Sequence, residues 1–349
     1  MINRIQYLDG LRAISIIMVL IGHGAHSFYN ASWIYFLGNS HLGVMIFFNI
    51  SGFLITTLLL KEITASGKID LPAFYLRRSL RIFPVFYTYI FVTAILVYYN
   101  VVFIEKDHFV FAATYLWNYK TALSNVSGGP DLWYLGHFWT LALEEQFYLL
   151  WPVALLVFNP VKLMRGLPFF LLLFPVFRFT SYMLVPDLRG QIGMMLHTMG
   201  DSILWGGYAA LLLFYKKEFI KEKLQILTNK IVLGLLLIFL FIGSCVLSMI
   251  FQGAYTITVG FILESISISM LILYLVLYQP RGFSFFNNKY IVYIGTLSYS
   301  LYIWQQLFLA KAPSSLLFEF PLNYVLCFLI AYISYNTVER LGLYIKSKL

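Results

Sequence analysis

Ten long apolar runs constrain the fold of this chain more than any other feature of its sequence. A membrane-spanning helix needs about 20 mostly apolar residues. Such runs lie at about 11–29, 42–60, 82–103, 138–158, 167–185, 197–215, 231–251, 256–279, 291–310 and 321–339. Charged residues make up only 11% of the 349-residue sequence, whereas a soluble domain carries about 25%. The sequence therefore predicts an all-α, polytopic membrane bundle of about ten transmembrane helices, with residues 1–349 as one domain.

The distribution of Lys and Arg predicts which way this bundle faces. These residues gather in the segments 61–81 and 216–230, and cytoplasmic loops carry such an excess. With an even number of spans, both chain ends are then expected in the cytoplasm. The apolar segment 109–119 is too short to cross and is expected to be re-entrant or interfacial, because a crossing there would reverse every later loop. The net charge of +9 follows from this asymmetry, and nucleic acid is not an expected partner.

Two ionisable residues, Arg12 and His23, lie in the first apolar run. An ionisable side chain at bilayer depth costs several kcal/mol, so a functional role is the default hypothesis for it. Eleven residues correspond to about 20° more than three helical turns, so both side chains share one helix face, separated by roughly 16 Å along the axis. Arg12 is expected near the cytoplasmic surface and His23 near the middle of the membrane.

Two adjacent carboxylates, Glu144 and Glu145, lie well inside the fourth run, HFWTLALEEQFYLLWP. Glu145 lies about 12 Å from the outer end and His23 about 20 Å from the inner end, so in a core of about 30 Å the depths nearly coincide. One carboxylate is therefore expected to orient the His23 ring and stabilise its protonated form. The alternative is that either Glu only hydrogen-bonds a neighbouring span.

Three arginines, Arg77, Arg78 and Arg81, lie at the cytoplasmic end of the third span, in FYLRRSLRIFP. Arg78 and Arg81 are three residues apart and share a helix face. Arginine suits bidentate recognition of phosphate. The alternative is an ordinary anchor that binds anionic membrane lipids. Arg12 at the same surface favours a phosphorylated ligand that reaches upward from the cytosol.

Further polar residues lie inside apolar runs, among them Ser51, Asp201 and Gln305. Each is more often a packing or interhelical hydrogen-bonding residue than a ligand contact, although a buried Asp201 needs a partner. The histidines are scattered, so the sequence predicts no metal site, and no Walker, GxGxxG or GxSxG motif is present.

Five motifs in order resemble the membrane-bound acyltransferase-3 family: LDGLRAISIIMVLIGH, FFNISGFLI, RRSLR, WTLALEEQFYLLWP and LSYSLYIW. The resemblance covers nearly the whole chain. It implies ten spans in a bacterial cytoplasmic membrane and transfer of an acetyl group from cytoplasmic acetyl-CoA to sugars of surface polysaccharides. It marks Arg12, His23, the pair Arg78 and Arg81, and the two carboxylates, and Asp201 falls where members often have an acidic residue. Members frequently have His where this chain has Gln305.

The sequence and the resemblance together predict an O-acetyltransferase with one membrane cavity. The expected phosphate-binding residues are Arg12, Arg77, Arg78 and Arg81. The expected catalytic residues are His23 as general base and Glu144 or Glu145 as its partner. Asp201, Ser51 and Gln305 are expected to contact the acceptor, a carbohydrate hydroxyl that is free or carried on a lipid.

Several alternatives stay open at this point. Direct transfer and an acetyl-His intermediate fit the sequence equally well. A transporter or flippase of lipid-linked sugars would also explain ten spans with buried polar groups, but no internal repeat of the kind common in transporters is seen. A non-catalytic membrane sensor is a third hypothesis for the function of this protein. The acyl group, the acceptor and the oligomeric state are not determined by the sequence.

Overall fold

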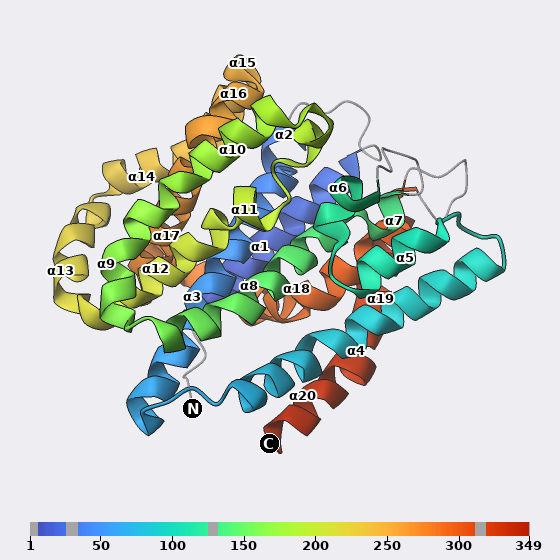
Figure 1. The fold of residues 1–349 in the computed structure, drawn as a ribbon, viewed down its shortest axis with the longest axis horizontal. Coiled ribbons are helices and arrows are strands. Elements are labelled where there is room, and N and C mark those ends of the chain that lie inside the picture. The colour runs from blue at the N-terminus through green and yellow to red at the C-terminus, as the bar shows by residue number, and fades with distance from the viewer. Residues whose placement is uncertain (1–5, 26–33, 125–131, 311–318, 349) are drawn as a thin grey trace.

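The computed structural model describes residues 6–25, 34–124, 132–310 and 319–348, and the regular structure in these ranges is helical (Figure 1). Residues 6–215 include α1 (Gln6–His23), α3 (Ser40–Ser66), α4 (Leu71–Tyr98), α8 (Phe138–Val157), α9 (Pro160–Leu171), α10 (Leu173–Leu184) and α12 (Asp201–Tyr215). Residues 230–347 include α14 (Lys230–Ile238), α15 (Ser244–Phe251), α16 (Gly253–Tyr255), α17 (Phe261–Tyr278), α18 (Lys289–Phe308), α19 (Leu322–Ser334) and α20 (Arg340–Ser347). Three π-helical segments join some of these: Phe239–Gly243, Thr256–Gly260 and Tyr335–Glu339.

The prediction of an all-α bundle with membrane-spanning helices is confirmed, whereas the number of ten spans and the orientation of the ends stay predictions. Within the described residues, six helices are long and apolar enough to cross a membrane: Ser40–Ser66, Leu71–Tyr98, Trp133–Val157, Pro160–Leu184, Lys230–Phe251 and Gly253–Tyr278. The first predicted span ends at residue 29, which lies outside the described ranges. The segment 109–119 forms part of α5 (Lys106–Ala113) and a short turn of 3-10 helix (Trp117–Tyr119), too short to cross.

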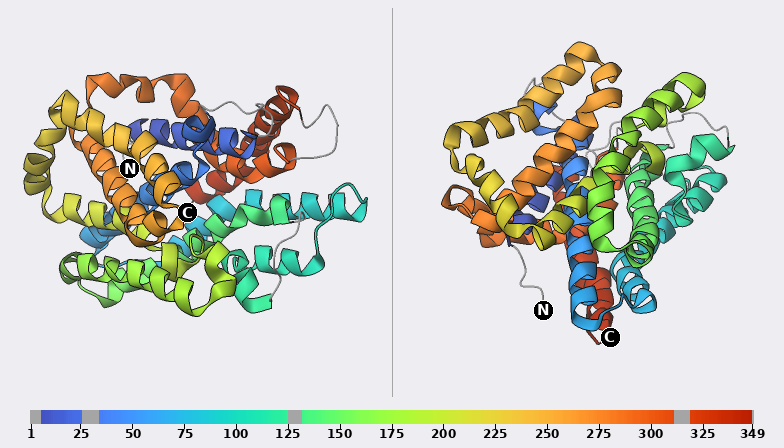
Figure 2. Two further views of the ribbon diagram at one scale, coloured as in Figure 1. Left: turned by 90° about the horizontal axis from the view of Figure 1, so that it is seen from above. Right: turned by 60° about the vertical axis from the view of Figure 1, so that its left-hand side comes forward.

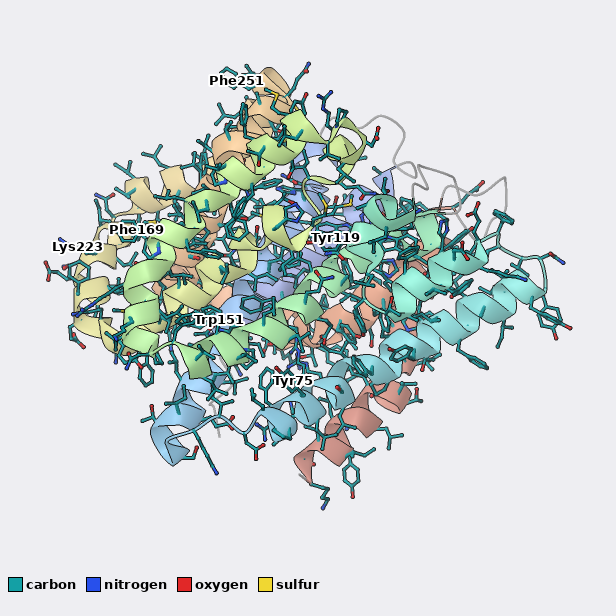
Figure 3. The ribbon with its side chains drawn as sticks, viewed as in Figure 1. Tyr75, Tyr119, Trp151, Phe169, Lys223 and Phe251 are labelled. Carbon is teal, nitrogen blue, oxygen red and sulfur yellow. The ribbon has the colours of Figure 1, made fainter. Side chains whose placement is uncertain are left out.

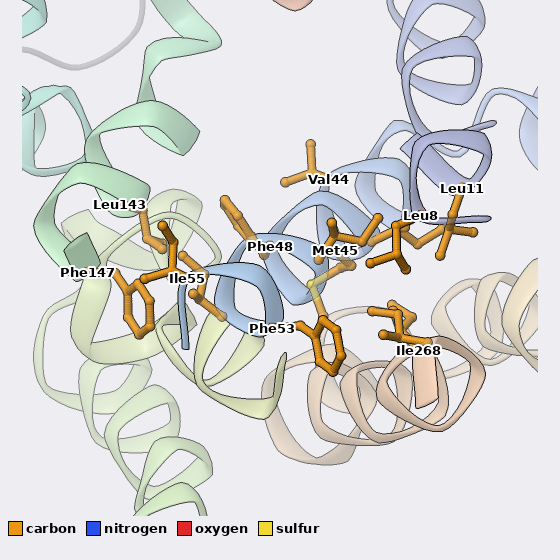
Figure 4. Packing of buried hydrophobic residues seen from close by; sticks show 14 of the residues in the cluster. Leu8, Leu11, Val44, Met45, Phe48, Phe53, Ile55, Leu143, Phe147 and Ile268 are labelled. Carbon is orange, nitrogen blue, oxygen red and sulfur yellow. The ribbon is translucent and has the colours of Figure 1, made fainter. Parts of the chain in front are cut away.

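Helix α3 is the centre of the bundle. In the right-hand view of Figure 2 it runs between the helices of residues 230–278 on one side and those of residues 138–215 on the other. Glycines let its neighbours approach closely: a Cβ on Gly52 would lie 1.9 Å from the Ile203 carbonyl oxygen of α12. Such small-residue contacts are typical of helix packing in membranes. Apolar side chains of α1, α3, α8 and α17 meet around α3 (Figure 4).

The periphery of the bundle is apolar. Phe169 is 74% exposed and Phe251 is 57% exposed, and both lie at the edge of the molecule in Figure 3. In a membrane protein such side chains face lipid, since lipid tails are as apolar as the protein core.

The start of α4 determines where three arginines point. Asp70 caps this helix by accepting a hydrogen bond from the Ala73 amide at 3.0 Å, and a proline occupies its first turn. The helix therefore begins at Leu71, well before the predicted span at 82–103. As a result Arg77, Arg78 and Arg81 lie on a regular helix, with Arg78 and Arg81 on one face and Arg77 directed away from them.

Candidate active site

A cavity of about 420 Å³ lies between α1, α3, α4, α8, α18 and the C-terminal segment. Charged side chains on its wall come from four different helical segments, and they are Asp9, Arg12, Arg78, Arg81, Glu144 and Glu339. Tyrosine, serine and threonine hydroxyl groups and apolar side chains complete the wall. A pocket with a few convergent polar groups in an apolar frame is the default candidate for a binding site.

The arginines of this cavity have hydrogen-bonding capacity left over. The Arg78 guanidinium stacks over the Tyr148 ring at 3.7 Å, and its Nε lies 3.9 Å from Glu145 Oε1. Both of these buried atoms lack a hydrogen-bond partner. Arg12 lies 3.8 Å from the Asp9 carboxylate, and Arg81 makes no ion pair within the described ranges. Buried donors without partners are costly, so the cavity is suited to an anionic ligand that would satisfy them.

Two carboxylates balance part of this positive charge. Glu144 lies in the electrostatic field of Arg78 and Arg12 and contacts Ser51 and Tyr148, which are themselves hydrogen-bonded to each other. Glu339 accepts a hydrogen bond from Ser300 at 2.7 Å and reaches the cavity from the π-helical segment that precedes α20.

His23 lies outside the wall of this cavity, at the last residue of α1. Its Nδ1 is 2.9 Å from Gln305 Oε1, and its ring meets the edge of Trp133 with centroids 5.6 Å apart. The predicted pairing of His23 with Glu144 or Glu145 is therefore wrong in this structure. The two carboxylates lie beside arginines instead, because a guanidinium compensates a buried carboxylate better than a neutral imidazole does.

A hydrogen-bonded contact between α8 and α18 separates His23 from the cavity. The Tyr302 hydroxyl lies on the cavity wall, 2.7 Å from Thr140 Oγ1, and it donates to the His137 carbonyl oxygen at 3.1 Å. One helical turn further along α18, Gln305 contacts His23 and Gln306 contacts His137. The cavity wall and the residue that contacts His23 are thus one helical turn apart along α18.

Two predicted ligand contacts lie elsewhere in the fold. Arg77 is directed to Glu62, with Nη2 3.3 Å from Oε2, and it does not line the cavity. Asp201 is completely buried and accepts hydrogen bonds from Arg178 at 2.9 and 3.0 Å. The partner that a buried Asp201 requires is therefore Arg178 on α10, which leaves this carboxylate no free face toward an acceptor. Ser51 lines the cavity, and its contact with the acceptor stays a prediction.

Sequence reasoning missed several residues of the site. Tyr148, Thr140 and Tyr302 carry ordinary hydroxyl groups in apolar helices, and no pattern distinguishes them from packing residues. Glu339 had one signal, a lone carboxylate at the end of the last apolar run.

A bundle of apolar helices around a cavity with three arginines on its wall indicates a membrane protein with a candidate binding site. Comparison with known proteins gives the family: the model of the acyltransferase domain matches residues 5–335, so the chain belongs to the acyltransferase-3 family of O-acyltransferases.

Two relatives come from Staphylococcus aureus. The O-acetyltransferase OatA of strain NCTC 8325 / PS 47 is 28% identical over 355 residues, covering 95% of this chain and 56% of the relative. A protein of strain COL, named only provisionally as an O-acetyltransferase, is 31% identical over 312 residues, covering 85% of this chain and 49% of the relative. The chain thus spans about half the length of these relatives. No solved structure matches.

Proposed function

We propose that this protein transfers an acetyl group from cytoplasmic acetyl-CoA to a hydroxyl of an envelope or lipid-linked carbohydrate. The observation that carries the proposal is the cavity on which Arg12, Arg78 and Arg81 converge, with guanidinium N–H groups that are not hydrogen-bonded. The phosphates of coenzyme A provide the anionic oxygens that these guanidinium groups lack. The cytoplasmic membrane of a bacterium is the expected location.

The pantetheine arm of the donor would run along α1, from Arg12 toward His23. Arg12 and His23 are eleven residues apart, and each residue adds about 1.5 Å, so they are separated by roughly 16 Å along the helix axis. The Tyr302–Thr140 contact lies on this route, so the thioester passes it to approach the imidazole.

His23 is the proposed general base, and Gln305 takes the orienting role that was expected of a carboxylate. When the Nδ1 hydrogen of His23 is donated to Gln305 Oε1, the lone pair of Nε2 is left to accept a proton. The acceptor hydroxyl gives its proton to Nε2 as its oxygen attacks the thioester carbonyl. The carbon–sulfur bond then breaks, and the coenzyme A thiolate takes up that proton. An acetyl-His intermediate is the competing route.

The two carboxylates have a positioning role in this proposal. Glu144 and Glu145 lie beside Arg78, and Glu144 also beside Arg12, so they hold guanidinium groups in place for the phosphates. Arg77 is left out of the phosphate site because it faces Glu62.

The test is acetyl transfer in proteoliposomes that contain the full chain. The donor is radiolabelled acetyl-CoA, and the acceptor is envelope polysaccharide of the host, stripped of its own esters by mild alkali. We expect alkali-labile label on the polysaccharide, and His23→Ala should lower kcat by about 100- to 10,000-fold, the usual contribution of a general base. Transfer at the normal rate by a correctly folded His23→Ala protein would remove His23 from the mechanism.

A further inference from the structure

A second histidine, His41, is paired with a carboxylate, whereas His23 is paired with an amide. His41 lies in the first turn of α3, and its Nε2 is 3.0 Å from Glu264 Oε2 on α17. The His41 side chain is 39% exposed, whereas Glu264 is only 7% exposed. Neither residue lines the arginine cavity. This pair is therefore a separate site, with a buried carboxylate behind an accessible imidazole.

The carboxylate of Glu264 is held on both of its oxygens. One oxygen faces His41, and the other accepts a hydrogen bond from Ser244, whose hydroxyl also lies 3.0 Å from the Tyr255 hydroxyl. Ser244 directly follows the π-helical segment Phe239–Gly243, and Tyr255 directly precedes the segment Thr256–Gly260. Isolated π-helical turns are rare and frequently occur at functional sites. Two of them here flank Ser244, which donates to the carboxylate, and Tyr255, which is hydrogen-bonded to Ser244.

The orientation of the His41 ring is fixed as well. It stacks on Phe261 with centroids 5.1 Å apart and an interplanar angle of 27°. The same Phe261 ring lies 5.1 Å from the Arg178 guanidinium, which anchors it in the bundle. With Nε2–H donated to Glu264, the neutral imidazole presents the lone pair of Nδ1 as an acceptor. A base oriented by a buried carboxylate is the arrangement that binds and polarises hydroxyl groups.

The pair lies at the His23 end of the bundle. A Cβ on Gly22 would lie 3.0 Å from the Ser40 side chain, so the end of α1 touches the start of α3. The hairpin of α15 and α16 carries Ser244 and Tyr255, and it lies at the upper edge of Figure 1. The loop between α3 and α4 and the helix α20 lie at the lower edge. By the predicted topology the upper edge faces outward, where a surface carbohydrate approaches.

We propose that His41 and Glu264 form a carbohydrate subsite in which a sugar hydroxyl of the acceptor chain donates a hydrogen bond to His41 Nδ1. The subsite holds a sugar unit next to the one that is acetylated, so it acts on acceptor affinity and leaves the chemical step to His23 at the nearby end of α1. This inference rests on the proposed acetyl transfer to carbohydrate.

The first test is a kinetic titration in the same proteoliposomes, with the alkali-treated envelope polysaccharide as the varied substrate. We expect His41→Phe, which keeps the stacked ring, to raise the apparent KM for polysaccharide about tenfold, the effect of one lost hydrogen bond. Glu264→Gln should also raise the apparent KM for polysaccharide. The KM for acetyl-CoA should stay unchanged in both variants. His197→Phe is the matched control, because His197 is an exposed histidine that stacks on Tyr119 at 5.9 Å.

An unchanged polysaccharide KM in a folded, active His41→Phe protein would overturn the subsite and leave the pair as a contact between helices.

A second measurement uses the unmodified protein and so does not depend on a variant that folds. Diethyl pyrocarbonate should label His41 more slowly in the presence of polysaccharide, while the labelling of His197 stays the same, as read by peptide mass spectrometry. Equal His41 labelling with and without polysaccharide would also overturn the subsite. Absence of acetyl transfer by the wild-type protein would instead contradict the proposed function.

Discussion

Arginines enclosed by the helices occur in two regions of this molecule, fully buried in one and partly buried in the other, and their surroundings differ. On α10, Arg178 is completely buried and donates to both Asp201 oxygens and to the carbonyl oxygens of Thr198 and Ile257, and its Nη2 has no partner. In the cavity, Arg78 has a buried Nε without a partner and Arg81 makes no ion pair within the described residues. The Arg178 charge is thus paired at 2.9 Å with a buried carboxylate, whereas Arg78 and Arg81 line a cavity that a ligand can enter.

The difference separates a structural ion pair from a binding site. Both regions place charge in a low-dielectric setting, where an uncompensated charge is costly. Arg178 and Asp201 compensate each other inside the protein, so no ligand is needed. On the cavity wall three arginines face three carboxylates, but Arg78 Nε–H has no hydrogen-bond partner, and an anion in the cavity would supply an acceptor for it. Substitutions in the first region should therefore change stability, and those in the second should change donor binding.

The largest effect is expected for Asp201→Asn. Loss of the carboxylate leaves the Arg178 charge buried and unpaired, which should lower the free energy of unfolding by about 3–5 kcal/mol. The decrease is measured as a lower Tm in detergent, followed by tryptophan fluorescence. Replacing both partners together, Arg178→Met with Asp201→Leu, should recover most of the loss. A stable Asp201→Asn protein with a raised KM for acetyl-CoA would contradict the separation of the two regions.

Arg81→Leu should give the next largest effect, and it should change donor binding instead of stability. The guanidinium has no ion pair to lose, so Tm should change little. The KM for acetyl-CoA should rise about 10- to 100-fold, because a hydrogen bond to a charged group contributes about 1.5–3 kcal/mol. The polysaccharide KM is the internal control and should not move. If KM for acetyl-CoA stayed normal, Arg81 would not be part of the phosphate site.

Hydropathy predicted the helices of this fold well, because the length of an apolar run is read directly from the order of residues along the chain. The convergence of Arg12, Arg78 and Arg81 was predictable for a similar reason, since the positions of the apolar runs place all three at the same end of their predicted spans. The partner of His23 was not predictable from depth alone. Depth does not say which way a helix faces, and α8 turns Glu144 toward Arg12 and Arg78. The pair of His41 and Glu264 joins residues 223 positions apart, and no local pattern indicates it.

A smaller effect is expected from pH, through Lys346 on α20. Burial, together with the charges of Arg81, Arg78 and Arg77, lowers the pKa of Lys346 to about 8. This lysine is therefore cationic below about pH 8 and neutral above it, and bound phosphates favour the cationic form. The KM for acetyl-CoA should rise a few-fold between pH 7 and pH 9. Lys346→Met should flatten that rise, and an unaltered pH profile in Lys346→Met would assign the titration to another group.

The smallest effect is expected for Arg77→Ala, one residue before Arg78. Arg77 pairs with Glu62 at 3.3 Å, and both side chains are partly exposed, so the pair contributes about 0–1 kcal/mol to stability. The KM for acetyl-CoA should change less than twofold, as measured beside Arg78→Ala. A large increase for Arg77→Ala would mean that the whole basic surface attracts the donor over a distance. Such an increase should then disappear in high salt, because a Debye length of about 10 Å at 0.1 M shrinks to about 3 Å at 1 M. An increase that persists in high salt would place Arg77 in direct contact with the phosphates and would require Glu62 to release it when the donor binds.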